Sequence, residues 1–134
     1  MTAENGINIL RYALVYGGLT IAASLLPQIV NLPPAAGVTA ALPPLVGSIV
    51  EGQSFAKATG DRARGREAVS ITFRLTAVAL AINLLLFGAA VAATQGRIFA
   101  GGVPVAQIAL AGAVLTLIQF ALNRLGLRLA PTKA

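Results

Sequence analysis

Glu51 is the acidic residue whose place in the sequence most suggests chemistry. It ends an uncharged run over residues 12–50 and opens a segment, residues 51–74, that holds eight of the fourteen charged side chains. The pattern places Glu51 within or near a membrane span, where an acidic side chain marks a candidate functional site. We expect an intramembrane ion pair with Arg74 or, alternatively, with Lys57.

Two interpretations of Glu51 remain open. A carboxylate paired with Arg74 stays ionised and attaches the second helix to the third. An unpaired carboxylate at that depth takes up a proton, because burial disfavours the charged form. The second case is what a proton-coupled transporter requires.

Three arginines, Arg62, Arg64 and Arg66, lie close together in the charged segment. They act as topogenic charges, and they also suit docking to the anionic headgroups of membrane lipids or to an acidic protein partner. The net charge of +6 does not indicate nucleic-acid binding, because the basic residues lie at the ends of apolar runs.

Groups that perform catalysis are scarce in this chain. It has no Cys and no His, which removes thiolate metal sites, the commonest metal ligand and the commonest general base. No nucleophile elbow, phosphate loop or HExxH sequence is present. We therefore expect no enzyme, no cofactor, and no catalytic, cofactor-binding or metal-binding residues.

The composition indicates that Glu51 and the three arginines lie among membrane helices. The chain is 57% hydrophobic and 10% charged, against about 25% charged in a typical soluble domain. Its uncharged runs contain 39, 22 and 26 residues (12–50, 75–96 and 98–123). Because about 20 helical residues cross a bilayer, the first run holds two helices and the others one each.

We therefore predict an all-α membrane protein, a single four-helix domain over residues 1–134 built from two antiparallel hairpins. The expected spans are residues 7–30, 36–58, 65–94 and 104–125. Pro33 and Pro34 break the first run, because proline lacks a backbone donor. Pro43 and Pro44 lie inside the second helix, and a kinked helix is favoured over one that begins at Leu42.

The basic residues predict the orientation. One side of the predicted topology carries nine Lys and Arg residues, and the other carries Arg97 alone. Short cytoplasmic loops are enriched in Lys and Arg. We expect both termini and the central hairpin in the cytoplasm of a bacterium, with the chain multi-pass in the inner membrane.

Neutral polar side chains inside the spans are candidates for interhelical contacts: Asn83, Gln107 and Gln119. An unpaired amide in hydrocarbon costs a few kcal/mol, so each is expected to face another helix. Tyr12 and Tyr16 are the only aromatics with a polar tip, and we expect them at the membrane interface. Small residues four apart, such as Gly18 with Ala22 and Gly112 with Thr116, favour helix packing or reflect general alanine enrichment.

The central hairpin carries a short pattern. Gly52 and Phe55 form G-x-x-F at the end of the second predicted helix, an Arg-rich loop follows, and Glu67 opens the third. In this pattern the chain resembles an uncharacterised family of small bacterial four-helix inner-membrane proteins. The resemblance implies a fold and a location and no established activity.

Three functions are consistent with these features. The first is an accessory or stabilising subunit of a larger membrane complex, which works by helix association with a protein partner or with further copies of itself. The second is a small proton-coupled transporter, with Glu51 as the coupling acid. The third is a lipid-binding protein that uses the three arginines.

Overall fold

The computed structural model describes residues 6–31 and 36–132. Within them the chain forms four α-helices and one short 3-10 helix, with no sheet, which confirms the all-α prediction. The elements are α1 (Ile9–Ile29), α2 (Ala36–Thr59), α3 (Gly65–Ala93), η1 (Arg97–Phe99) and α4 (Val105–Leu129).

Local signals explain two of the helix ends. The side chain of Asn8 caps α1 by accepting a hydrogen bond from the backbone N–H of Arg11 at 3.1 Å. Gly60 follows α2 with a φ of +85°, and its N–H donates to the carbonyl of Ala56 at 2.8 Å. Glycine is favoured at such a C-terminal position because it has no Cβ to clash.

The described prolines of the first uncharged run all lie inside helices, Pro27 in α1 and Pro43 and Pro44 in α2. α2 begins at Ala36 and continues through Pro43 and Pro44, so it does not begin at Leu42. The break predicted at Pro33 and Pro34 lies outside the described residues.

α4 extends beyond its predicted end at residue 125, to Leu129. The sequence placed Gly126 just after the helix, where glycine is common. In the structure Gly126 lies inside α4 and touches Ser48 of α2. Gly126 therefore serves as a point of close contact between two helices and not as the end of α4.

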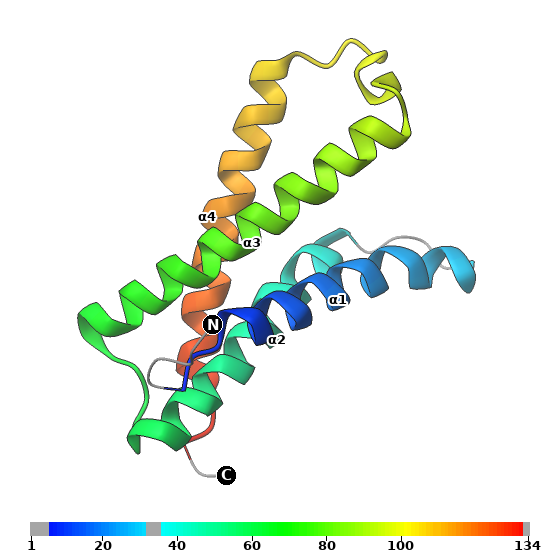
Figure 1. The fold of residues 1–134 in the computed structure, drawn as a ribbon. Helices are drawn as coiled ribbons and strands as arrows, with labels where there is room; N and C mark the ends of the chain where they lie inside the picture. The colour runs from blue at the N-terminus through cyan, green and yellow to red at the C-terminus, as the bar shows by residue number, and fades with distance from the viewer. Residues whose placement is uncertain (1–5, 32–35, 133–134) are drawn as a thin grey trace.

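The four helices form two hairpins that meet at one end of the molecule (Figure 1). α1 pairs with α2, α3 pairs with α4, and α2 also packs extensively on α4. The first turns of α1 and α3 and the last turns of α2 and α4 gather at this shared end, which we call the base. Away from the base the hairpins diverge, and most side chains in the distal halves of α3 and α4 are exposed.

Three of the helices in the described part of the chain are long and apolar enough to cross a membrane: α1, α3 and α4. They indicate a multi-pass membrane protein. α2 is not among them, because its apolar stretch is interrupted by two prolines and ends at Glu51. The fourth predicted crossing, by α2, therefore stays a prediction.

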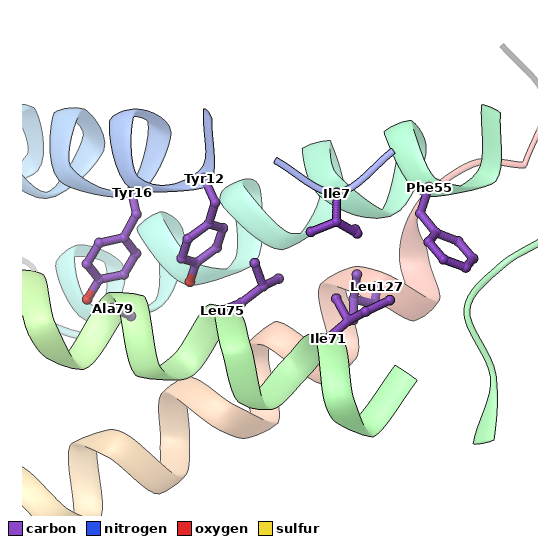
Figure 2. Close-up of a cluster of buried hydrophobic side chains, with 8 residues drawn as sticks. All are labelled: Ile7, Tyr12, Tyr16, Phe55, Ile71, Leu75, Ala79 and Leu127. Carbon is purple, nitrogen blue, oxygen red and sulfur yellow. The ribbon is translucent and has the colours of Figure 1, made fainter. Parts of the chain in front are cut away.

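The core lies near the base, between the two hairpins. Tyr12 and Tyr16 of α1 point toward Leu75 and Ala79 of α3 (Figure 2). The two tyrosine rings stack with centroids 5.8 Å apart and are at most 2% exposed. Their hydroxyls bond to side chains of neighbouring helices, so both tyrosines pack inside the bundle. Their expected position at the membrane interface stays a prediction.

Candidate functional site

Glu51 is fully buried in α2, and its carboxylate is bound by Arg11 of α1. Arg11 Nε donates to Oε1 at 2.7 Å and Nη2 donates to Oε2 at 2.8 Å. Oε2 also accepts the backbone N–H of Asn8 at 2.7 Å. Both carboxylate oxygens are therefore satisfied, in the two-bonded geometry that makes Arg–carboxylate pairs strong.

The partner of Glu51 differs from the predicted one. The sequence indicated Arg74 or Lys57, whereas the structure places Arg11 in this role. Arg74 and Lys57 both have exposed side chains. Arg11 is well placed because α1 starts at the end of the molecule where α2 finishes, and its guanidinium also donates to the carbonyl of Gly6 at 3.0 Å.

This geometry is that of an ion pair which holds two helices together. The side chain of Glu51 is 0% exposed and that of Arg11 is 38% exposed. A carboxylate that exchanges protons with water needs contact with a wet cavity, and Glu51 instead faces its three donors. The arrangement therefore favours the structural interpretation of Glu51 over the transport interpretation.

The hydroxyl of Tyr16 joins three helices. It donates to Asn83 Oδ1 of α3 at 2.9 Å and accepts from Gln119 Nε2 of α4 at 2.6 Å. Two of the polar residues singled out in the sequence thus meet on one tyrosine. Gln107, the third, is exposed near the start of α4 and lies outside this cluster.

A second polar cluster lies closer to the base. Tyr12 of α1 donates to Asn123 Oδ1 of α4 at 2.9 Å, and Asn123 Nδ2 donates to Thr76 Oγ1 of α3 at 3.1 Å. Asn123 is 0% exposed. Each of these bonds gives a partner to a polar group that would otherwise be unpaired in an apolar setting. Because the bonds join α1, α3 and α4, they fix the rotation of these three helices about their axes.

Three glycines bring helices into close contact. A Cβ at Gly126 would overlap Ser48 Oγ, and one at Gly52 would lie 2.6 Å from the Cβ of Ala130. One at Gly47 would lie 2.8 Å from the ring of Tyr12. These contacts let α2 pack closely on α4 and α1, as small residues do between membrane helices.

The three arginines Arg62, Arg64 and Arg66 have different environments. Arg62 and Arg64 line a pocket of about 350 Å³ together with Arg124 and Arg128 of α4. Arg66, the third arginine, is exposed on the first turn of α3 and is not part of the lining.

No three His, Cys, Asp or Glu side chains within residues 6–31 and 36–132 come together as metal ligands. Comparisons with protein-family models, with curated proteins and with solved structures found no match to this chain. The resemblance carried by Gly52 and Phe55 therefore stays a prediction. Both residues are buried near the end of α2, where Gly52 faces α4.

Sequence reasoning missed several residues of these clusters: Arg11, Tyr12, Asn123, Arg124 and Arg128. Arg11 was counted only as a topogenic charge. The signal that could have found it is the hairpin itself, because an antiparallel pair brings the start of α1 beside the end of α2, where Glu51 lies.

Proposed function

We propose that this chain is a small integral membrane protein that works by helix association, as an accessory or stabilising subunit of a larger membrane complex. It crosses the inner membrane of a bacterium several times, with both termini and the basic α2–α3 loop in the cytoplasm. The partner is another membrane protein or a further copy of the chain.

One observation carries this proposal. The helical glycines whose surroundings the structure describes differ from one another, and only some of them lie against another part of the chain. At Gly47, Gly52 and Gly126, atoms of neighbouring segments occupy the space that a Cβ would take. Gly18, Gly88 and Gly112 are exposed, and a Cβ at any of them would meet no other atom within 4 Å.

The exposed glycines support association because helices in lipid pair through close backbone contact at small residues. Lipid tails are as apolar as leucine, so membrane helices gain from close backbone approach at small residues. The chain already uses this device between α2 and α4. The same kind of position on the outward faces of α1, α3 and α4 offers a surface that another helix can approach closely.

The charged and polar groups give further support. The buried acid is neutralised by Arg11, and the half-buried amide of Asn83 and the buried amide of Asn123 are bound to tyrosine hydroxyls. These groups hold the helices together. A proton-coupled transporter that uses Glu51 has less support, because that carboxylate is enclosed by donors.

Native mass spectrometry after mild detergent extraction tests the proposal. We expect an assembly larger than one chain, reduced to the monomer by Gly112→Leu or Gly88→Leu. Val114→Phe is the matched control, because residues 112 and 114 lie about 200° apart around a helix. A lone monomer under every mild condition, or equal loss of the assembly in the control, contradicts the proposal.

A further inference from the structure

The pocket at the base is unusually basic for its size. Its lining contains four arginines, with Gly65, Ala63, Ala68 and Leu127 as the remaining residues. Among the described residues, no acidic side chain takes part in the lining. Asp61 is nearby in sequence, but its contact with Arg64 is long, at 3.4 Å, and both side chains are more than 60% exposed.

Arg124 of α4 lines the pocket. Its Nη1 atom is buried and has no hydrogen-bond partner among the described residues. A buried guanidinium is costly without a counter-charge, and an anion in the pocket that Arg124 lines would offset that cost. The residue lies one turn before Arg128 on α4, so both guanidinium groups reach the pocket from the same helix.

Backbone groups add to the positive potential. α3 begins at Gly65, and its cap residue Arg64 makes no side-chain hydrogen bond to the first turn. The first N–H groups of a helix lack partners within the helix and attract anions. Arg62 Nε donates to the carbonyl of Ala130 at 3.0 Å, which fastens the loop to the end of α4.

We propose that this pocket binds a phosphate group. Arginine is suited to phosphate because its planar guanidinium offers paired donors. The volume of about 350 Å³ falls at the lower end of the range for small-molecule sites, which suits a headgroup or a small phosphate compound. The site does not depend on the association function proposed above.

The phosphate group comes either from an anionic phospholipid or from a soluble compound. Val69 and Leu125, which adjoin the lining residues Ala68 and Arg124 in sequence, are exposed apolar side chains. They offer acyl chains a contact beside the pocket. The predicted position of the base at the cytoplasmic headgroups also favours a lipid.

The test uses the full chain in nanodiscs. Phosphatidylglycerol binding is measured by native mass spectrometry in a phosphatidylcholine background. Inorganic phosphate binding is measured by ³¹P NMR in nanodiscs of phosphatidylcholine alone. The pocket variant is Arg62→Gln with Arg64→Gln, and the control is Lys57→Gln with Arg66→Gln, which removes two exposed charges outside the lining.

We expect the pocket variant to bind phosphatidylglycerol about tenfold more weakly or worse, and the control to change by less than about twofold. Binding of inorganic phosphate with the same sensitivity also supports the site and assigns it to a soluble ligand. Equal weakening in both variants means that diffuse surface charge attracts the lipid, which overturns the proposal. Absence of binding for both probes overturns it as well.

Arg62 also bonds to Ala130, so its replacement could disturb the loop. Arg64→Gln alone avoids this, because the exposed side chain of Arg64 has only the long contact with Asp61 in the part of the chain that the structure describes. This single variant must also weaken binding of the phosphate-bearing probe, by several-fold. Unchanged binding in this variant, with the loop intact, contradicts the proposal.

Discussion

Arg11 and Glu51 lie 40 residues apart in the chain and form a two-bonded ion pair at the base of the molecule. The pair fixes the first turn of α1 against α2, together with the backbone N–H of Asn8. It neutralises an acid that would otherwise be buried without a counter-charge.

Replacing Glu51 by Gln is expected to destabilise the fold. It leaves Arg11 without a counter-charge and weakens the bond to Asn8. Breaking a buried pair costs about 3–5 kcal/mol, and the partial exposure of Arg11 reduces this to about 2 kcal/mol. Unfolding by denaturant in detergent measures the change, with Lys57→Gln as the control. Equal stability of the Glu51 variant and the parent would show that the pair contributes nothing.

Gly126 provides a second test, because it lies where α4 meets α2. Gly126→Ala places a methyl group against Ser48 and the carbonyl of Leu45, and overpacking of this kind costs about 1–3 kcal/mol. Gly112→Ala on the same helix meets no atom and is expected to be neutral or slightly stabilising, since alanine is the better helix former. Similar effects of the two substitutions on the unfolding free energy would contradict the packing described here.

The hydrogen bond between Tyr12 and Asn123 is suited to a double-mutant cycle. Tyr12→Phe and Asn123→Leu each remove one partner, and the double variant isolates their coupling. Hydrogen bonds between membrane helices average about 0.6 kcal/mol and reach about 1.7 kcal/mol. We expect a coupling in the upper half of that range, because Asn123 is fully buried. A coupling near zero would mean that the bond does not form in the membrane.

The helical fold was predictable because charged residues, together with Pro33 and Pro34, divide this sequence into segments of helical length. An uncharged run of sufficient length predicts a membrane helix without knowledge of the segments that pack on it. Three of the four helices begin and end within two residues of their predicted limits. α4 is the exception. A glycine such as Gly126 serves equally as a helix end or as a contact point, and only the neighbouring Ser48 decides between them.

The contacts of the site were harder to predict, for a related reason. The sequence correctly indicated that Asn83 and Gln119 are buried or half-buried polar groups, but it did not indicate which helix faces which. That choice depends on the rotation of each helix, and the two tyrosines of α1 determine it by reaching both α3 and α4. The partner of Glu51 depends on the same rotation.

The central claim is that the base, with its arginines, lies in the cytoplasm and that the two hairpin tips lie across the membrane. The chain has no cysteine, so single substitutions at exposed positions report cleanly. Labelling of intact cells with an impermeant maleimide is the most direct measurement. Val30→Cys and Ala100→Cys should react, and Arg66→Cys should react only after the cells are opened. Labelling of Arg66→Cys in intact cells, or protection of Val30→Cys, would contradict the claim.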